Sequence, residues 1–520
     1  MLIDANGFPA GTALAADICI IGAGAAGLIV AHELAQTGRD ILVLESGGPG
    51  PAPATAALMT GRAVTRPPFQ LAGARRQLGG SFSDWGANCA LIDAADLAAP
   101  AEAGGPCWPS ALAQLNGLAA RAADYLSGFR GFGDFSLEET AALRPMPGRG
   151  DGDGDGDAAG GAWREKLYLR GAADAAARLA GRLARADSPV RLVLHATALE
   201  IAIADGEATA LHFANLAGAR STVRARTFVV AAGTENAPLL LRSFGPDSAA
   251  ARRRLPALGR FLHAHLLSLH GFLLPGGPRK RLHRYLLPVT RDGIGESPRP
   301  HFSGLVPPAT IAAPDEGLGH CLFLEPAIHD APLLTRETVA RAGRWRRIPR
   351  HHNPRFMAAA KRVGWSCAPA IYGLRHYMEQ PPRWEAEVSL GAPAGPFGLG
   401  AAQFRWQIGE AEKRQMIAAC ASLAALAPGD GFGRAVDHQE IADAAGADFG
   451  RNAHPMGGTV IGTDPARSVV DENLRVHGVG NLHVCGGSAI PRSGTAMTTS
   501  LIAQLALHLA DRLKRDGAGR

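Results

Sequence analysis

The residue with the clearest chemical capacity in this chain is His454, which lies in the sequence NAHPMGG of residues 452–458. An imidazole has a pKa near neutrality, so its neutral form can take a proton from a hydroxyl group at physiological pH. On spacing alone, His454 fits a catalytic base and an ordinary loop histidine equally well. A lone histidine identifies no reaction. The choice between these two interpretations therefore depends on whether the rest of the sequence predicts a cofactor site beside it.

Three glycines near the N-terminus predict a dinucleotide site. They form the pattern G-x-G-x-x-G in the sequence IGAGAAG: Gly22, Gly24 and Gly27. The pattern follows an expected strand over 17–21 and opens an expected helix over 26–37, and a second strand is expected over 41–44. In such a βαβ unit the glycines allow a tight turn, a close approach to a pyrophosphate and close packing of helix on strand. The N-terminus of the helix attracts the phosphates.

Glu45 ends the second expected strand, 18 residues after Gly27. Its carboxylate can accept a hydrogen bond from a ribose 2′-hydroxyl and would repel a 2′-phosphate, so the site is expected to bind FAD or NAD and not NADP. Enzymes that pass electrons from a nicotinamide to FAD usually carry two glycine fingerprints. Neither the glycines at 398–400 nor those at 478–480 complete a second one. If the single site holds FAD, the reductant must be the substrate itself.

The remaining sequence predicts a second βαβ return and a separate antiparallel region. A strand is expected over 227–231 with a helix from 235 to 243, and the alternating stretch before it reads as a β-meander with a turn at Asp205-Gly206. The region 260–440 is rich in Pro, His and aromatic residues and predicts an antiparallel sheet with covering helices. The stretch 493–515 predicts an amphipathic helix that ends in Arg and Lys.

Composition and charge argue against several classes of protein. The chain has 520 residues, 47% hydrophobic and 19% charged, with a net charge of +6. No basic stripe alternates with aromatic residues, so we expect no nucleic-acid binding. No signal sequence and no window of 18 apolar residues is visible, so we expect no export signal and no transmembrane segment. Seven cysteines without a C-x-x-C pair suggest free thiols and a cytoplasmic location.

An acidic stretch at 149–161, RGDGDGDGDAAGG, has to be compared with a calcium-binding loop. Asp151, Asp153 and Asp155 match the first three ligand positions of an EF-hand, but the twelfth position is Ala162 and not Glu. The essential bidentate ligand is missing. We therefore expect a flexible acidic surface loop and no metal site.

At this point the sequence resembles the glucose-methanol-choline (GMC) oxidoreductase family, and more narrowly its bacterial branch that acts on sugars and polyols. Six matches occur in chain order: IGAGAAG with LESGG, RRQLGGSFSDWGANCALID (75–93), RTFVVAAGTENAPLLLRS, ALGRFLHAH, HYMEQPPRWEAEVSL (376–390) and the stretch from HPMGG to GGSAIP (454–491). The resemblance implies an α/β fold. It has a discontinuous Rossmann-like FAD-binding domain (1–105, 186–262 and 440–520), an α+β substrate domain with an antiparallel sheet (263–439) and an insertion or cap (106–185).

The resemblance also implies which residues hold FAD. The adenosine diphosphate half would contact the fingerprint and the end of the second strand: Gly22, Gly24, Gly27 and Glu45. The pyrophosphate and the isoalloxazine ring would lie along a glycine-rich loop: Gly79, Gly80, Ser81, Gly86 and Asn88. The backbone of Ala198 would contact adenine, and three C-terminal residues would flank the ribityl chain and the ring: Gly487, Met497 and Thr498. Residues 70–106 contain no His, so the FAD is expected to be non-covalent.

In this family the His of the H-x-x-G motif faces the flavin and acts as general base, and His454 matches that position. Relatives usually place a second His or Asn where this chain has Met497. A thioether cannot donate a hydrogen bond and accepts only weakly, so a partner for the substrate oxygen is missing here. Residues that could replace it lie nearby in the sequence: Asn452, Arg492, Ser493, Thr495 and Thr498. The alternatives are an apolar or pre-activated substrate, altered chemistry such as that of a lyase or decarboxylase, or a non-catalytic flavin-binding partner protein.

Other polar residues are expected to have structural roles. His263 and His265 form an H-x-H pair that reads as part of a structural turn and not as a metal site, and His351-His352 reads as a surface loop. Trp85 reads as a packing residue beside the flavin loop. Among His376, Tyr377 and Glu379, one is a candidate for lining the pocket.

The sequence therefore predicts an FAD-dependent oxidoreductase that oxidises a CH–OH group of a sugar, cyclitol or related natural product to a carbonyl. Hydride would pass to the flavin and the proton to His454. The substrate would be a small-molecule alcohol, and the final electron acceptor would be oxygen or another carrier. The sequence leaves open the choice between oxidase and dehydrogenase, and the oligomeric state.

Overall fold

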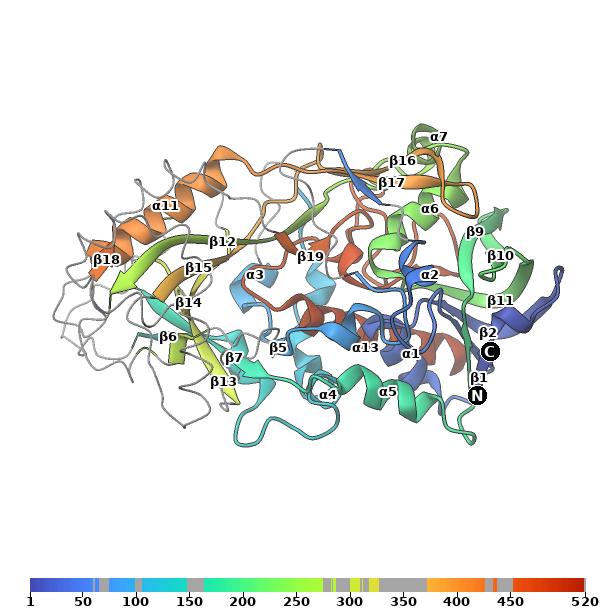
Figure 1. Ribbon diagram of the computed structural model, residues 1–520, viewed down its shortest axis with the longest axis horizontal. Coiled ribbons are helices and arrows are strands. Elements are labelled where there is room, and N and C mark those ends of the chain that lie inside the picture. The colour runs from blue at the N-terminus through green and yellow to red at the C-terminus, as the bar shows by residue number, and fades with distance from the viewer. Residues whose placement is uncertain are drawn as a thin grey trace.

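Two sheets organise the chain, one at each end of the elongated view in Figure 1. The computed structural model describes residues 1–58, 61–64, 74–98, 105–146, 163–274, 282, 284–286, 300–308, 311, 318–326, 372–425, 434–436 and 452–518. The acidic stretch 149–161 and the pair His351-His352 lie outside these described residues.

The first sheet is built on the predicted βαβ unit, which consists of β2 (Ala13–Ile21), α1 (Ala25–Leu34) and β3 (Ile41–Leu44). The strands β2 and β3 pair in parallel, with Ile18 opposite Ile41. Their apolar residues are buried on both faces, as parallel strands covered by helices require. Three predictions are therefore confirmed: strand, helix and strand. The helix ends at Leu34, before the predicted end at residue 37.

Four further strands extend this sheet in parallel: β1 (Leu2–Asp4), β8 (Val190–Leu194), β11 (Arg220–Val230) and β20 (Leu482–Val484). The strand β2 begins earlier than predicted because residues 13–16 pair with residues 222–225 of β11. The antiparallel strands β9 (Thr197–Ala204) and β10 (Glu207–Ala214) complete the sheet. Asp205 and Gly206 join them at φ values of +50° and +75°, which confirms the predicted hairpin turn.

Helices cover the parallel sheet. The long C-terminal helix α13 (Thr498–Ala518) packs against α1 and against α4 (Ala119–Leu126), and α5 (Ala175–Leu183) packs on α1 as well. The helix α6 (Asn236–Phe244) packs on β9 and is followed by α7 (Ser248–Arg254). Two further short helices are α2 (Pro53–Ala56) and α3 (Ala94–Ala98). None of the helices in the described ranges has both the length and the apolar character needed to cross a bilayer.

The second sheet is antiparallel and draws its strands from distant parts of the chain. Its central strands are β12 (His263–Leu274), β15 (Tyr372–Glu379), β14 (His320–Pro326), β13 (His301–Val306) and β7 (Arg164–Arg170). Shorter strands join them: β5 (Asn88–Cys89), β6 (Leu143–Pro145), β18 (Arg434–Val436) and β19 (Asn452–Met456). The antiparallel sheet predicted within 260–440 is confirmed.

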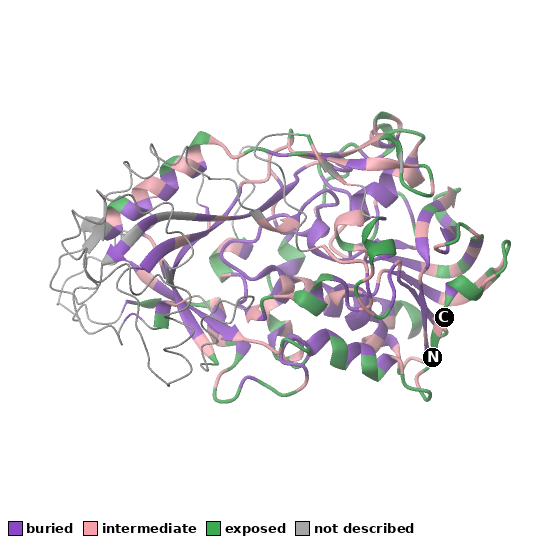
Figure 2. Ribbon diagram, in the orientation of Figure 1, coloured by how far each residue is buried: buried purple, intermediate pink, exposed green. Residues whose placement is uncertain are grey.

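Alternation along these strands separates two apolar layers. Most described residues of β14 and β15 are buried, as the colouring in Figure 2 shows. Leu322 and Leu324 of β14 pack in one cluster with Cys420 of α11 (Glu410–Ala425). Their neighbours Cys321 and Phe323 pack in a different cluster with Tyr377 and Met497. Successive side chains of a strand point to opposite faces, so residues adjacent in sequence line a helix contact and a cavity.

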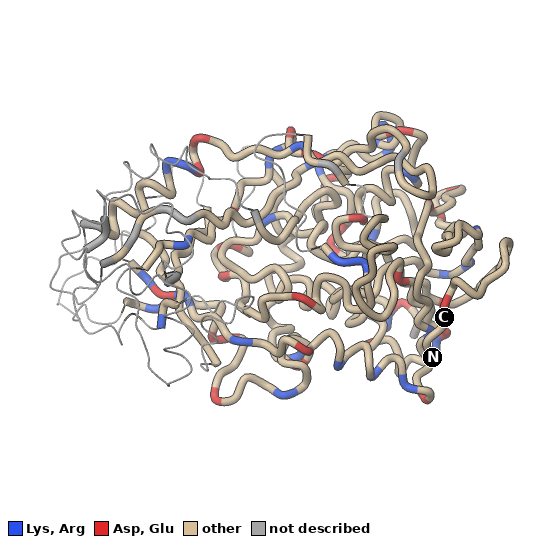
Figure 3. The backbone as a smooth tube through the Cα atoms, in the orientation of Figure 1, with Lys and Arg blue, Asp and Glu red and all other residues tan. Residues whose placement is uncertain are grey.

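A third, small sheet consists of the hairpin β16 (Glu387–Ala394) and β17 (Leu399–Arg405) with the short strand β4 (Arg62–Ala63). The strands β6 and β7, which lie within the segment expected to be an insertion or cap, join the second sheet. The domain boundaries stay a prediction. Figure 3 shows acidic and basic residues interspersed along the described backbone.

Candidate active site

A cavity of about 910 Å³ is lined by residues from both large sheets. This volume is near the upper end of the range of roughly 300–1,000 Å³ for ligand pockets. We distinguish two parts of the cavity. The dinucleotide part is lined by Gly22, Gly24, Glu45 and Ala198, and the His454 part is lined by Leu267, Phe323, Tyr377, His454 and Met497.

The glycine fingerprint gives the dinucleotide part its shape. Gly22 has a φ of +104°, and a Cβ atom there would lie 2.5 Å from the carbonyl oxygen of Ala231. A Cβ atom on Gly27 would lie 2.0 Å from the carbonyl oxygen of Gly22, so only glycine lets the helix approach the strand this closely. Gly24, in contrast, has no atom within 4 Å of such a Cβ position. The backbone there is open to the cavity, as contact with a pyrophosphate requires.

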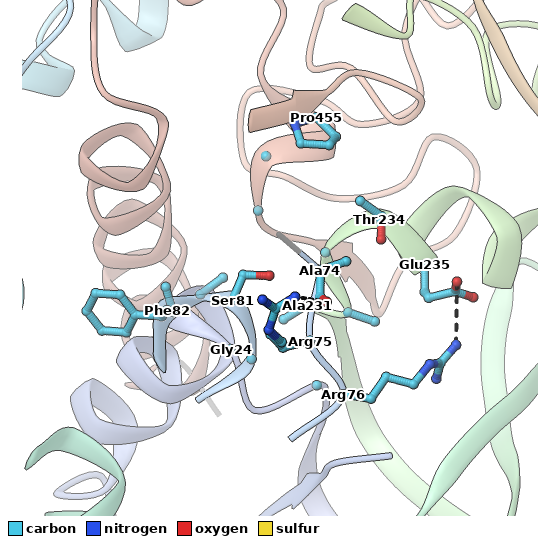
Figure 4. Close-up of a pocket in the computed structure, with 18 of the residues that line it drawn as sticks. Gly24, Ala74, Arg75, Arg76, Ser81, Phe82, Ala231, Thr234, Glu235 and Pro455 are labelled. Carbon is cyan, nitrogen blue, oxygen red and sulfur yellow. Dashed lines mark hydrogen bonds and ion pairs between the residues drawn. The ribbon is translucent and has the colours of Figure 1, made fainter. Parts of the chain in front are cut away.

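The loop of Gly79 to Ser81 crosses this open space. The N–H group of Gly79 donates to the carbonyl of Ala23 at 2.8 Å, and a Cβ atom on Gly80 would lie 3.1 Å from the Cα atom of Gly24. Figure 4 shows Gly24, Ser81 and Arg75 beside one another. The loop therefore brings a second set of backbone groups to the same side of the cavity as the helix N-terminus.

Glu45 is buried at the end of β3 and holds the turn that follows β2. Its two carboxylate oxygens accept from the N–H groups of Ala23 at 2.9 Å and of Gly47 at 2.8 Å. Burial raises the pKa of Glu45, and these two backbone hydrogen bonds oppose that effect. Each oxygen keeps a second lone pair, so the carboxylate can still accept from a ribose hydroxyl. Beside it, Arg76 lies 3.4 Å from the carboxylate of Glu235 (Figure 4).

Most of the predicted cofactor residues line the cavity: Gly22, Gly24, Glu45, Gly80, Ser81, Gly86, Asn88, Ala198, Gly487, Met497 and Thr498. Gly27 and Gly79 are not among the lining residues and instead shape the turn and the loop. Trp85 lines the cavity, packs on Phe82 at 4.8 Å between ring centroids, and donates to the carbonyl of Ala172. An open phosphate cradle, a buried acceptor for ribose and a cavity of this size fit FAD.

His454 is placed by a distortion of β19. The register between β12 and β19 shifts between His263 and His265, which marks a β-bulge, and His454 has a φ of +58°. A residue other than glycine in this left-handed region costs roughly 1–3 kcal/mol and is often found at functional sites. Bulges next to active sites re-aim a side chain, and here the imidazole lines the cavity.

The two nitrogens of His454 have different surroundings. Its Nδ1 lies 3.4 Å from the hydroxyl of Tyr377 and 3.4 Å from Nδ1 of His265. The described residues offer no hydrogen-bond partner to its Nε2. Burial lowers the pKa of His454 to about 4, so the imidazole is neutral at physiological pH. A neutral imidazole with one unengaged nitrogen in a cavity is what a general base needs.

His265 and Tyr377 form a buried pair behind His454. Their rings stack at 4.2 Å between centroids, and Nδ1 of His265 lies 3.0 Å from the hydroxyl of Tyr377. That hydroxyl donates to the carbonyl of Ala496 at 2.9 Å. On its other side, Nε2 of His265 lies 3.0 Å from the hydroxyl of Ser493 and donates to the carbonyl of Gly494 at 3.2 Å. Burial and the nearby His454 keep the pKa of His265 well below its usual value.

The other polar residues named from the sequence differ in whether they line the cavity. Tyr377 lines the cavity, whereas His376 faces away from it, with its ring nitrogens near His320 at 2.9 Å and Cys420 at 3.1 Å. His263 is buried and contacts the carbonyl of Phe261 at 2.8 Å. In the described part of the chain, no group of three or more His, Cys, Asp or Glu residues is arranged to hold a metal ion.

Glu379 fixes the loop that carries Met497. Its carboxylate is fully buried, pairs with Arg492 at 3.1 Å and accepts from the N–H groups of Ser493 and Gly494. Asp96 lies against Gly494, and burial together with Glu379 raises the pKa of Asp96 to about 7. Arg492 and Ser493 are therefore both engaged in holding this loop.

Met497 gives the His454 part an apolar wall. It packs in one cluster with Phe323, Tyr377 and Tyr168, and Leu267 packs against that cluster. The hydroxyl of Thr495 lies 3.4 Å from the carboxylate of Asp93 and does not line the cavity. Thr498 does line it, while its hydroxyl contacts the sulfur of Met456 at 3.7 Å. The side chain of Asn452 lies outside the described residues. The geometry thus gives Thr495 no direct access to a bound substrate.

Sequence reasoning missed the contact between His265 and His454. These residues are 189 positions apart, and nothing in the local sequence of either one indicates the other. The strand pairing of β12 with β19 on one edge and β15 on the other brings them together. A weak signal existed for Tyr377, because it was one of three residues considered for the pocket wall.

Two family models match the chain. Residues 17–354 match the family described as FAD dependent oxidoreductase. Residues 382–506 match the family described as GMC oxidoreductase. The first match covers the fingerprint, and the second covers His454 and Met497.

Comparison with known proteins gives similar sequences and folds. The large subunit of fructose dehydrogenase from Gluconobacter japonicus is 43% identical over 68 residues, which are 13% of this chain and 12% of that protein. The crystal structure of pyridoxine 4-oxidase from "Mesorbium loti" superposes with a TM-score of 0.57 at 18% identity, over 96% of this chain and 99% of that one. Formate oxidase of Aspergillus oryzae superposes with a TM-score of 0.55 at 16% identity, over 98% and 100%. At these identities the structures establish the fold alone.

Proposed function

Because the chain belongs to the FAD-dependent oxidoreductases and carries a GMC oxidoreductase domain, we propose that it oxidises a CH–OH group to a carbonyl with His454 as the general base. The observation that carries the proposal is the position of His454, whose unengaged Nε2 belongs to a neutral imidazole lining the cavity that fits FAD. When bound, FAD supplies the acceptor for the hydride that leaves the substrate carbon.

The protein residues would then handle the proton. Nε2 of His454 accepts the hydroxyl proton of the substrate, so that the oxygen can form the carbonyl as the hydride leaves the carbon. Leu267, Phe323 and Met497 form an apolar wall that excludes water from the reacting carbon. Arg492 and Ser493 are engaged in holding the loop, so His454 is the polar group that we propose to contact the substrate hydroxyl.

We propose a sugar, cyclitol or related natural product as the substrate. The similarity to a fructose dehydrogenase subunit supports the sugar and polyol branch of the family. The apolar wall favours, within this class, a natural product that presents an apolar face next to the reacting hydroxyl, because each hydroxyl buried against that wall would lose hydrogen bonds to water.

FAD would be held non-covalently, since residues 70–106 contain no His. Free thiols at six described cysteines support a cytoplasmic location, and oxygen or another carrier would reoxidise the flavin.

Met497 favours one second candidate. With a thioether where relatives place His or Asn, the site lacks one usual contact to the substrate oxygen, and a flavoprotein with lyase or decarboxylase chemistry, or without catalysis, is the alternative. Such a protein would bind FAD and leave it oxidised. Oxygen consumption and dye reduction then separate an oxidase, a dehydrogenase and this alternative.

The test is anaerobic titration of the purified holoprotein. Sugars, cyclitols and simple alcohols are added while the flavin absorption is followed, with His454→Ala measured in parallel. Bleaching in the parent protein and at least 100-fold slower bleaching in His454→Ala, about the lower bound for loss of a general base, support the proposal. A bound yellow flavin that no alcohol bleaches, or equal rates in both proteins, would overturn it.

A further inference from the structure

We propose that Tyr377, held in place by His265, is the positioning residue that fixes which nitrogen of His454 carries the proton. The inference rests on the proposed function of His454 as a base. It concerns two side chains on β12 and β15 that the sequence did not connect with catalysis.

The hydroxyl of Tyr377 has one proton, and the geometry shows where it goes. Tyr377 donates to the carbonyl of Ala496 at 2.9 Å, and a carbonyl oxygen can only accept. The ring nitrogens near the hydroxyl are Nδ1 of His265 at 3.0 Å and Nδ1 of His454 at 3.4 Å. Nδ1 of His265 has a lone pair, because Nε2 of that ring donates to the carbonyl of Gly494 at 3.2 Å, and it shares the hydroxyl hydrogen with Ala496. The oxygen of Tyr377 therefore acts as an acceptor toward Nδ1 of His454, which must present an N–H group to it.

The remaining contacts of the two rings agree with this assignment. With its proton on Nε2, a neutral His265 donates toward the carbonyl of Gly494 at 3.2 Å, and the lone pair on its Nδ1 faces the N–H group on Nδ1 of His454 at 3.4 Å. With its proton on Nδ1, a neutral His454 has its lone pair on Nε2, the nitrogen to which the described residues offer no partner. The tautomer that the contacts select is thus the one that can accept a proton from a substrate.

The pair is rigid enough to impose this choice. Tyr377 is 2% exposed and His265 is fully buried, and their rings stack. The strands that carry them pair with His265 opposite Glu379 and Leu267 opposite Tyr377, so the two side chains are diagonal neighbours on one face of the sheet. At 3.4 Å the bond to His454 is long, so its effect is to select a tautomer more than to add stability.

The hydroxyl of Tyr377 and the ring of His265 supply polar contacts behind the base, whereas the cavity wall at Met497 supplies none. Met497 occupies the position where relatives carry a second His or Asn, and it offers no donor. Here the polar support lies behind the base, in Tyr377 and His265. When Nε2 of His454 takes the substrate proton, the imidazolium keeps its N–H on Nδ1, and the oxygen of Tyr377 stabilises that cation as an acceptor.

Tyr377→Phe tests the proposal, with Tyr168→Phe as the matched control. Tyr168 is an equally buried tyrosine of the same apolar cluster, and it donates to the carbonyl of Thr495 at 2.9 Å without contacting either histidine. Each variant thus removes one buried hydroxyl bonded to the same loop. In Tyr377→Phe we expect the anaerobic bleaching rate at saturating alcohol to fall about tenfold or more, with less than about a threefold change in the half-saturating concentration. In Tyr168→Phe we expect both to stay within about twofold of the parent.

A spectroscopic readout separates this inference from the proposed function. In holoprotein with nitrogen-15 histidine, the signals absent from His454→Ala belong to His454, and in the parent protein Nδ1 should carry the proton. In Tyr377→Phe these two signals should move toward each other as the tautomers mix. His265→Phe keeps the ring stacking but removes both ring nitrogens, and should produce a smaller shift. A parent protein with the proton on Nε2, or signals and rates in Tyr377→Phe that match those of Tyr168→Phe, would overturn the inference. If no alcohol bleaches the parent, the proposed function fails while the nitrogen signals still decide the tautomer.

Discussion

The two parts of the cavity are built in opposite ways. The dinucleotide part is formed mainly by backbone groups of the fingerprint and of the Gly79–Ser81 loop, together with the carboxylate of Glu45. The His454 part is formed by side chains on β12, β14, β15 and β19 and on the loop before α13. A cofactor with an invariant phosphate chain can be held by a local backbone motif, whereas a substrate that differs between enzymes needs side chains chosen one by one.

We therefore expect substitutions in the two parts to change different measured quantities. Variants in the dinucleotide part should change how much FAD the protein holds. Variants in the His454 part should leave the protein yellow and change how fast, or with which substrate, the flavin is bleached. Four measurements test this separation, in order of decreasing expected effect.

The largest effect is expected for Gly27→Ala. The new Cβ atom would lie 2.0 Å from the carbonyl oxygen of Gly22, so α1 must move away from β2 and the phosphate cradle must open. We expect the purified variant to hold little or no FAD, as measured by the ratio of flavin to protein absorption. Gly181→Ala in α5, where no atom lies within 4 Å of the new Cβ, serves as the helical control and should remain yellow. A yellow Gly27→Ala protein would contradict the role of the fingerprint.

His454→Ala should retain FAD and lose activity. Removing a general base typically slows the reaction roughly 10²–10⁴-fold. The anaerobic bleaching rate measures this loss, and the flavin content of the same sample measures occupancy. His376→Ala is the matched control, because His376 lies on the adjacent position of β15 from Tyr377 but contacts His320 and Cys420. A similar loss of rate in both variants would mean that the effect is structural.

Acidification should act on the His454 part. The base must be neutral, and burial lowers the pKa of His454 to about 4, so the neutral form persists well below pH 6.5. We expect the bleaching rate to be constant at neutral and mildly acidic pH, and to fall as the pH decreases through about 4 because the imidazolium cannot accept a proton. A rate that already falls near pH 6.5 would show that the ring is not shielded as the structure indicates.

The smallest effect is expected at Met497. Met497→Leu conserves volume and should cost less than about 1.5 kcal/mol with little change in rate. Met497→Asn places an amide among Phe323, Tyr377 and Leu267 and should cost about 1–3 kcal/mol of stability. In return, it should raise the rate with polyhydroxylated substrates relative to simple apolar alcohols. Thermal unfolding and the ratio of bleaching rates measure the two effects, and unchanged selectivity in Met497→Asn would contradict the proposed wall.

The two parts of the cavity also differ in how far the sequence predicted them. The strand Ile41–Leu44 and the glycine turn between β2 and α1 were predicted, because a βαβ unit depends on residues close in sequence. The contact of Glu45 with a ribose stays a prediction. The family matches confirm FAD and the GMC resemblance. The early start of β2 was not predicted, because residues 13–16 become a strand only by pairing with β11.

By itself, the sequence predicted the dinucleotide fingerprint, His454 as the candidate base and a thioether at position 497 in place of a polar residue. Only the tertiary structure decided that Tyr377 lines the cavity while His376 faces away, and that His265 supports Tyr377 behind His454. The physical reason is that a phosphate site uses N–H groups that one short segment aligns. A proton-accepting site requires side chains whose mutual distances are set by strand register and by one β-bulge.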